Sequence, residues 1–143
     1  MRVYLDNCCF NRPFDDQTQA KVRLQAEAKL ELQQRIKDHR VELAWSYVLD
    51  FENQANPFPE RRDLIARWRA EATVDLEETA AIVRRAREIA NRGLPAKDAL
   101  HIACAMAGQC EFFLTTDDLL VKIMQGFPGI TVLDPTQFVI EVE

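Results

Sequence analysis

Four acidic residues, far apart along the chain, are the side chains whose types and positions could do chemistry together. They are Asp6, Glu52, Asp98 and Asp117. Asp6 directly follows the apolar segment 3–5, and Asp117 lies soon after the apolar segment 112–114. Carboxylates that approach within about 4 to 6 Å repel one another, so such a cluster makes physical sense mainly around divalent cations. The acids therefore predict a metal centre, provided that the fold brings them together.

Oxygen ligands favour the hard cations Mg²⁺ and Mn²⁺ over zinc or copper. Such cations activate water and neutralise a phosphodiester during in-line displacement, so the reaction needs no histidine base. The chain has only two histidines. His39 lies at a polar helix end, and His101 follows Asp98 by three residues, which suggests a structural or supporting role for His101. Zinc bound by His101 and Cys104 is a weaker alternative, because the cysteines lack a Cys-x-x-Cys spacing and read as buried reduced thiols.

Each acid also has a purely structural explanation. An acid after a strand can hydrogen-bond within its own turn. Asp98 and Asp117 lie in first helical turns, where a negative charge stabilises the helix dipole by about 0.3 to 1 kcal/mol. Asp50 competes with Glu52 for a place in the cluster, and Asp118 is the one-residue alternative to Asp117. Only the combination of all four segments favours the metal centre.

The elements that must position these acids alternate between strand and helix. Strands are predicted at 3–5, 41–45, 72–74, 112–114 and 130–133. Helices are predicted at 22–32, 46–55, 59–70, 77–92, 95–107 and 117–124, with Ser46 as the N-cap of the second and Gly93 and Gly108 as C-terminal stops. Strands separated by helices imply an α/β fold with a parallel sheet of four to five strands, covered on both faces.

The segment 22–32 alternates apolar and polar residues strictly, which by itself favours a strand. Its composition of Ala, Leu, Glu, Lys, Gln and Arg instead predicts a helix. Period-two spacing on a helix produces two apolar stripes, Val22, Ala26 and Leu30 on one side and Leu24, Ala28 and Leu32 on the other. One stripe can cover the sheet, and the second is expected to need a neighbouring helix or a partner chain.

Length and composition set outer limits. The 143 residues fit one domain spanning residues 1–143, and the 48% hydrophobic content is that of a globular protein. No run approaches the roughly 18 apolar residues of a membrane helix, and the N-terminus lacks a signal-peptide core, so we expect a cytoplasmic protein. The net charge of −5 argues against nucleic-acid binding if the charge is evenly spread. If the four acids hold cations, the remaining charge is near neutral and that objection lapses.

The acidic motifs resemble those of PIN domains, including the VapC toxins of bacterial toxin–antitoxin pairs. The matching residues are Asp6 after Val-Tyr-Leu, Ser46 leading to Glu52, Lys97-Asp98-Ala99-Leu100-His101-Ile102-Ala103, and Leu114-Thr115-Thr116-Asp117. The resemblance runs from Arg2 to about Val139. It implies a three-layer α/β/α PIN-like fold and metal-dependent cleavage of RNA, with Asp6, Glu52, Asp98 and Asp117 as catalytic metal ligands. Thr115, Thr116 and Ser46 would support these ligands, together with Asn7 and Asp118. The last two depart from the family pattern, since Asn7 follows the first acid and Asp118 is an extra acid.

The leading hypothesis is therefore a Mg²⁺- or Mn²⁺-dependent endoribonuclease, and the resemblance implies the toxin of a type II toxin–antitoxin pair. Its expected partners are an RNA substrate, an antitoxin protein and a second copy of the chain in a homodimer. Three arginines are the candidates for binding the RNA backbone, Arg12, Arg61 and Arg62, with Arg67 and Arg69 further along the same helix. Each of them could equally belong to a solvated face.

Two other hypotheses come from different classes. The first is a catalytically silent PIN-like module for protein interaction or RNA binding, which the second apolar stripe of segment 22–32 would suit. The second is a phospho-acceptor or phosphatase domain with Asp6 as nucleophile, which the missing acid two residues later disfavours. With glycine only at positions 93, 108, 126 and 129, no glycine-rich phosphate-binding loop can be formed.

Overall fold

Five parallel strands form the centre of the protein, in the spatial order β3-β2-β1-β4-β5. The structure, a computed structural model, describes residues 1–142. The strands are β1 (Arg2–Leu5), β2 (Glu42–Ser46), β3 (Val74–Leu76), β4 (Phe112–Leu114) and β5 (Thr131–Leu133). The α/β fold with a parallel sheet of four to five strands is confirmed. The third strand lies about two residues later than the sequence predicted.

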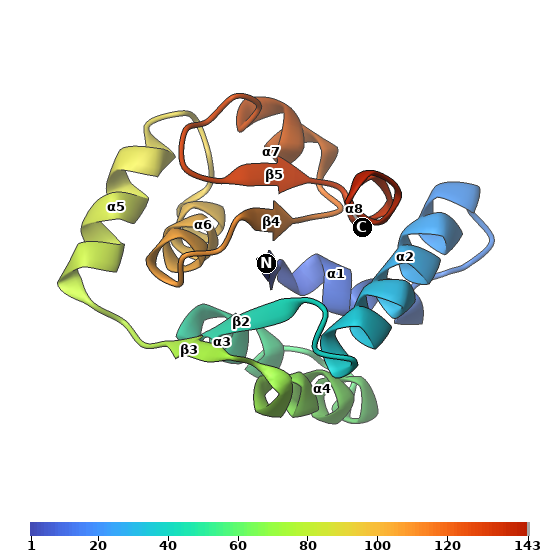
Figure 1. Ribbon diagram of the computed structural model, residues 1–143. Coiled ribbons are helices and arrows are strands. Elements are labelled where there is room, and N and C mark those ends of the chain that lie inside the picture. Colours follow the sequence, from blue (N-terminus) through green and yellow to red (C-terminus); the bar gives the residue numbers. More distant parts are fainter. Residues whose placement is uncertain (143) are drawn as a thin grey trace.

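Helices follow or separate the strands along the chain (Figure 1). They are α1 (Asn7–Asn11), α2 (Ala20–Lys37), α3 (Tyr47–Gln54), α4 (Pro59–Ala66), α5 (Ala80–Ala90), α6 (Ala96–Ala107), α7 (Asp118–Ile123) and α8 (Pro135–Glu141), with 3₁₀ segments η1 (Arg12–Phe14) and η2 (Arg67–Glu71). The short helices α1 and α8 were not predicted. Helix α5 begins three residues later than predicted because the Thr79 hydroxyl accepts from the Ile82 N–H and caps it there.

Helices cover both faces of the sheet, as two neighbouring residues of β4 demonstrate. Phe113 stacks on Tyr4 of β1, whose ring edge meets His101 of α6. Phe112 points the opposite way and packs edge-on against Phe138 of α8. Because successive side chains of a strand alternate between faces, α6 lies on one face and α8 on the other. Helix α5 packs on α6, and α2 packs beside α8, which completes the three layers.

Helix α2 does not carry the two separate apolar stripes that the alternation predicted. Of the first predicted stripe Leu30 is exposed, and of the second Leu24 is exposed while Leu32 is fully buried. The buried side chains instead follow the ordinary helical period and include two polar residues, Gln25 and Lys29. The prediction failed because packing selects a face by the 3.6-residue period, whatever residue types occupy it.

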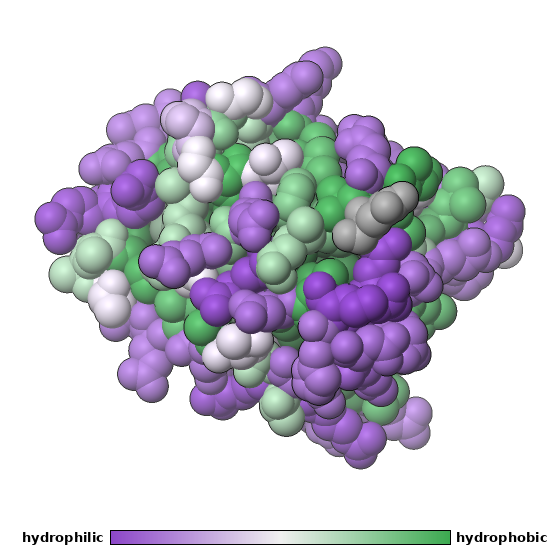
Figure 2. Space-filling view, viewed as in Figure 1, coloured by the Kyte–Doolittle hydropathy of each residue, from purple (hydrophilic) through white to green (hydrophobic). Residues whose placement is uncertain are grey.

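Most of the surface in Figure 2 is hydrophilic, with apolar side chains gathered beside α8 and α2. Leu24 of α2 is 51% exposed and Ile140 of α8 is 76% exposed, and both line one shallow surface cavity. Within residues 1–142, no helix combines the length and the hydropathy needed to cross a membrane.

Candidate metal centre

The middle of the sheet places the first acid of the proposed centre. Strand order reverses at β1, since β2 and β3 lie on one side of it and β4 and β5 on the other, and functional groups gather beyond the strand ends at such a point. Leu5 of β1 pairs with Leu114 of β4, so the next residues, Asp6 and Thr115, emerge side by side. The Thr115 hydroxyl donates to Asp6 Oδ2 at 2.9 Å, and Asp6 is almost fully buried. Thr115 therefore holds the Asp6 carboxylate in place.

Glu52 reaches Asp6 from the other side of β1. It lies on α3, which follows β2, and its Oε1 is hydrogen-bonded to His101 Nε2. The same imidazole nitrogen is 3.8 Å from Asp6 Oδ1. Burial alone would raise the pKa of Glu52, but the hydrogen bond and charge of His101, with Lys97 at 4.0 Å, outweigh it and lower that pKa. Glu52 is thus held as a carboxylate.

The rival acid Asp50 is engaged elsewhere. Its Oδ1 accepts from Trp45 Nε1 at 2.8 Å, and its Oδ2 is 3.6 Å from the Arg69 guanidinium. Asp50 and Glu52 are two residues apart on α3, so their side chains point about 200° apart around the helix axis. Local geometry therefore supports Glu52 over Asp50, for a reason that spacing alone did not supply.

A buried chain of hydrogen bonds runs from Glu52 through His101 to Tyr4 and Ser46. Tyr4 Oη is 2.6 Å from both Ser46 Oγ and His101 Nδ1, and Ser46 Oγ accepts from the Leu49 N–H. Burial raises the pKa of Tyr4 well above its ordinary value, so the phenol keeps its proton. Because an ionised Glu52 can only accept, His101 Nε2 carries the proton of their hydrogen bond. The chain fixes the orientation of the imidazole.

Asp98 lies half-buried in the first turn of α6, where the negative charges of the other three acids act on it. Burial raises the pKa of Asp98 first, followed by the negative charges of Asp6 and Asp117, with a smaller contribution from Glu52. Repulsion among carboxylates without a cation is the electrostatic signature of a site that favours positive charge. The four acids named from the sequence are thus brought within electrostatic reach of one another.

Asp117 and its neighbour Asp118 have different surroundings. Asp117 is the N-cap of α7, where its Oδ1 accepts from the Leu119 and Leu120 N–H groups at 3.0 and 3.2 Å. Its charge nevertheless acts on Asp98. Asp118 forms an ion pair with Lys21 of α2 and is exposed. The geometry supports Asp117 as the acid of the cluster, with a capping role as well.

The remaining supporting residues contribute unequally. Thr115 Oγ1 also accepts from the Asp117 N–H at 3.2 Å, so it links two of the acids. Thr116 contacts the site through its backbone N–H, which lies 3.4 Å from Cys8 Sγ. Asn7 donates its backbone N–H to Asp6, while its side-chain Oδ1 is buried without a hydrogen-bond partner among residues 1–142. That orphaned oxygen beside the acids is an additional donor atom that a cation or its water could satisfy.

The donor set fits a divalent cation. One ligand atom each from Asp6, Glu52 and His101 lie within 4.8 Å of one another, and Asp98 and Asp117 add two nearby negative charges. Carboxylate oxygens suit Mg²⁺ or Mn²⁺. His101 Nε2 holds the proton of its hydrogen bond to Glu52, so it could bind a cation only after losing that proton. From its spacing after Asp98, the sequence predicted a structural or supporting role for His101, and the fold shows that its imidazole contacts Glu52.

The arginines predicted to bind RNA are already engaged within the chain. Arg12 donates to Gln25 Oε1 at 2.8 Å, and Arg61 donates to the Phe14 carbonyl at 3.1 Å. Arg62 donates to a backbone carbonyl just before its own helix, at 3.3 Å. All three are partly buried. The exposed cation beside the acids is instead Lys97, directly before Asp98, which the sequence reasoning did not single out.

Ser46→Ala is expected to lower the free energy of unfolding by about 1 kcal/mol, because it removes the N-cap of the helix that carries Glu52. Urea denaturation measures the loss. Thr79→Ala is the matched control, since it removes a comparable cap from α5. Both variants should lose similar stability, and only Ser46→Ala should also lower activity, through Tyr4. Equal activity in the two variants would contradict a role for Ser46 in the site.

Two kinds of comparison place this geometry among known proteins. The fold is similar to VapBC2 from Rickettsia felis, crystallised with a DNA fragment from the promoter, at 12% identity and TM-score 0.57, covering 92% of this chain and 97% of that one. It is also similar to a toxin–antitoxin complex from Klebsiella pneumoniae, at 14% identity and TM-score 0.59, covering 93% and 97%. No curated protein matches the sequence. The PIN domain family model matches residues 3–124, most of the chain, and the chain therefore belongs to the PIN domain family, whose members are generally nucleases.

Proposed function

We propose that this protein is a Mg²⁺- or Mn²⁺-dependent endoribonuclease, folded as one PIN domain over residues 1–143. The observation that carries the proposal is the close approach of Asp6, Glu52 and His101, which each offer one ligand atom within 4.8 Å of the others, in a PIN domain where the charges of Asp6, Glu52 and Asp117 act on Asp98. Structural capping could explain each acid singly, but it does not explain a raised Asp98 pKa caused in part by its acidic neighbours.

Asp6, Glu52, Asp98 and Asp117 would hold the cation, with His101 beside them. When bound, such a cation supplies Lewis acidity and activates water for attack on a phosphodiester. The chain's own residues prepare the site for it. Thr115 orients Asp6, and the His101–Tyr4–Ser46 chain orients Glu52 and keeps it ionised.

The RNA backbone would contact a cation that lies beside the acids. Lys97, 58% exposed beside Glu52, is positioned to contact a phosphate of the substrate. Arg12, Arg61 and Arg62 remain proposed RNA contacts that would have to exchange their present partners. We expect Lys97→Ala to weaken cleavage and to reduce the dependence of log kcat/KM on log salt by about one unit of slope, as the loss of one phosphate contact does. Lys122→Ala, on the exposed face of α7, is the control, and an unchanged slope for Lys97→Ala would refute the assignment.

The function is tested by incubating the purified protein with structured and unstructured RNAs in Mn²⁺, in Mg²⁺ and in EDTA. Cleavage should require the divalent cation and should disappear in Asp6→Asn. Asp63→Asn changes an exposed acid of α4 and serves as the matched control. Cleavage that persists in EDTA, or in Asp6→Asn, would overturn the metal mechanism. RNA binding without cleavage by the wild-type protein would favour the silent binding module instead.

The proposed partners are an antitoxin protein and a second copy of the chain. The structural likeness to two complexes described as VapBC2 and as toxin–antitoxin supports the first. The exposed apolar side chains Leu24 and Ile140 support a protein contact at α2 and α8. Light scattering of the purified chain distinguishes a dimer from a monomer. A monomer at all accessible concentrations would contradict the homodimer.

A further inference from the structure

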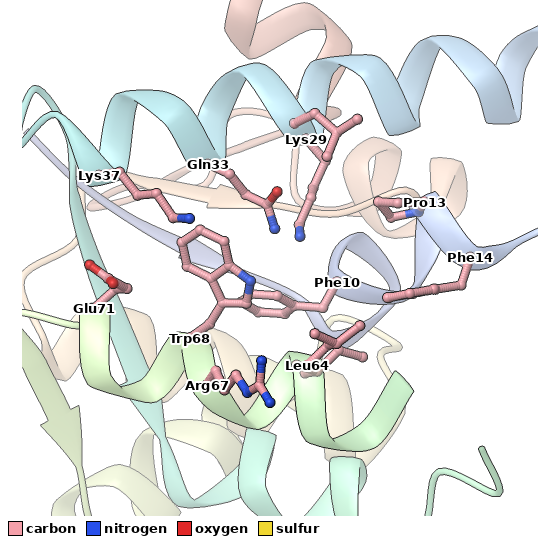
Figure 3. A pocket seen from close by; sticks show the side chains of 12 residues that line it. Phe10, Pro13, Phe14, Lys29, Gln33, Lys37, Leu64, Arg67, Trp68 and Glu71 are labelled. Carbon is pink, nitrogen blue, oxygen red and sulfur yellow. The ribbon is translucent and has the colours of Figure 1, made fainter. Parts of the chain in front are cut away.

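A second cavity lies between helix α2 and the α4–η2 segment and has a volume of about 510 Å³ (Figure 3). It is lined by aromatic, apolar and basic side chains and shares no lining residue with the four acids of the proposed metal centre. Three cationic side chains, from Lys29, Lys37 and Arg67, line it, and Glu71 is the single acid among its lining residues. The cavity is therefore positively charged, in a protein whose net charge is negative.

Lys29 is the unusual residue of this cavity. It occupies the buried face of α2 and is only 3% exposed. Its ammonium lies 5.4 Å from the centre of the Phe10 ring and 5.2 Å from that of Trp68. Gln33, one turn along, accepts from Lys29 and from the Trp68 Nε1–H in the amide orientation that satisfies both donors. No carboxylate within residues 1–142 forms an ion pair with Lys29.

A buried ammonium without an anionic partner is costly, and such charges are normally paired. Burial lowers the pKa of Lys29 to about 8, and the positive charge of Lys37 acts in the same direction. Lys37 lies over the same Trp68 ring at 5.5 Å, and Lys29, Gln33 and Lys37 form one row at i, i+4 and i+8 of α2. Two ammonium groups and an amide thus face one cavity, where an anion would compensate them.

The rim of the cavity indicates what else the ligand carries. Phe14, Leu30 and Leu64 line it with side chains that are 39%, 53% and 45% exposed. Exposed apolar side chains gain from being covered by an apolar body. The volume falls within the range of about 300 to 1,000 Å³ typical of small-molecule sites.

We propose that this cavity binds a small organic anion, with its carboxylate or phosphate ester at Lys29 and Lys37 and its apolar body against Phe14, Leu30 and Leu64. Recognition by a charge-assisted hydrogen bond inside an apolar wall gives both affinity and selectivity for anions. This site is separate from the proposed metal centre, and its assignment stands whether or not the protein cleaves RNA.

The two tryptophans of the chain provide a site-specific test. Trp68 presents its indole N–H to Gln33 in the cavity, while the Trp45 N–H is bound to Asp50 elsewhere. Titrations of the full-length protein followed by the two indole N–H resonances would use 2-naphthoate, 2-naphthyl phosphate and the neutral 2-naphthalenemethanol. Trp68→Phe assigns the signals, and comparison of the two anions shows whether carboxylate or phosphate is preferred.

We expect the anions to shift the Trp68 signal, to leave that of Trp45 in place, and to bind at least about tenfold more tightly than the alcohol. Lys29→Met should remove this preference while the fold persists, because replacing a buried charge with an apolar side chain is often neutral or stabilising. Lys122→Met should retain it. Lys37→Met changes an exposed residue and should weaken the same preference. It replaces Lys29→Met in the test if Lys29→Met does not fold.

Three results would overturn the proposal. The first is equal affinity for the alcohol and the anions, and the second is wild-type binding by Lys29→Met or, in its place, by Lys37→Met. The third is a Trp68 shift caused by a single-stranded oligoribonucleotide but by neither naphthyl anion, which would instead place the cavity on an RNA path.

Discussion

Asp98→Asn should lose more than about 100-fold of the RNA cleavage rate and yet unfold at a higher temperature than the wild-type protein. The loss should exceed the 10- to 100-fold that is typical of residues that only orient a metal ligand. The gain in stability follows from the raised pKa of Asp98, whose ionised form is disfavoured by burial and by Asp6 and Asp117. Neutral asparagine removes that repulsion, so function and stability change in opposite directions.

The raised pKa of Asp98 also predicts how the effect of Asp98→Asn on stability changes with pH. The folded protein binds the Asp98 proton more tightly than the unfolded chain, since the folded pKa is raised. Asp98 therefore lowers stability increasingly as the pH rises from its unfolded value of about 3.9 through its folded pKa. The stabilising effect of Asp98→Asn should be complete above the folded pKa and absent below about pH 3.9.

Thermal unfolding in EDTA between pH 3.5 and 8, beside an RNA cleavage assay in Mn²⁺, measures both effects. Asp118→Asn is the matched control, because this acid also lies in the first turn of a helix but pairs with Lys21. It should leave cleavage nearly unchanged and should not raise the unfolding temperature. Mn²⁺ should stabilise the wild-type protein more than Asp98→Asn. An Asp98→Asn protein that is both active and less stable would contradict the clustered site.

His101→Leu should lower cleavage by about 10- to 100-fold and the free energy of unfolding by about 1 to 3 kcal/mol. The imidazole is fully buried and connects the Tyr4 hydroxyl to Glu52. Leucine fills the space but leaves the Tyr4 hydroxyl without its partner and releases the Glu52 carboxylate. Removing one member of a buried hydrogen-bonded chain lowers the free energy of unfolding by more than a typical hydrogen bond contributes, because the partner that remains is buried without a hydrogen bond.

The second variant, His101→Gln, separates positioning from metal binding. Its amide can donate to Glu52 but cannot replace an imidazole ligand. If His101 acts by holding Glu52, His101→Gln should recover most of the activity and the wild-type Mn²⁺ affinity, measured by calorimetry. If it is a ligand, the Mn²⁺ affinity should stay low. Ile102→Val, a buried neighbour on α6, controls for packing and should cost about 0.5 to 1.5 kcal/mol with activity retained. Full activity in His101→Leu would exclude both roles.

Much of the fold was determined by local signals in the sequence. Apolar segments before Asp6 and Asp117 became β1 and β4, and the helix propensity of segment 22–32 correctly prevailed over its alternating pattern to form α2. Parallel pairing then followed from the alternation of strands and helices, and it placed both acids at one edge of the sheet. These predictions succeeded because they depend on residues close in sequence and on a general rule of topology.

Only the tertiary structure decided which side chains meet. The sequence suggested the four acids as candidates, but the choice of Glu52 over Asp50 depends on the direction of α3, and the contact of His101 with Glu52 joins residues 49 positions apart. Packing likewise placed Lys29 on the buried face of α2, which no local signal in the sequence indicates. Local propensity fixes the type of an element, whereas the side of that element that is desolvated depends on partners distant in sequence, and burial determines the charge, pKa and chemistry of these groups.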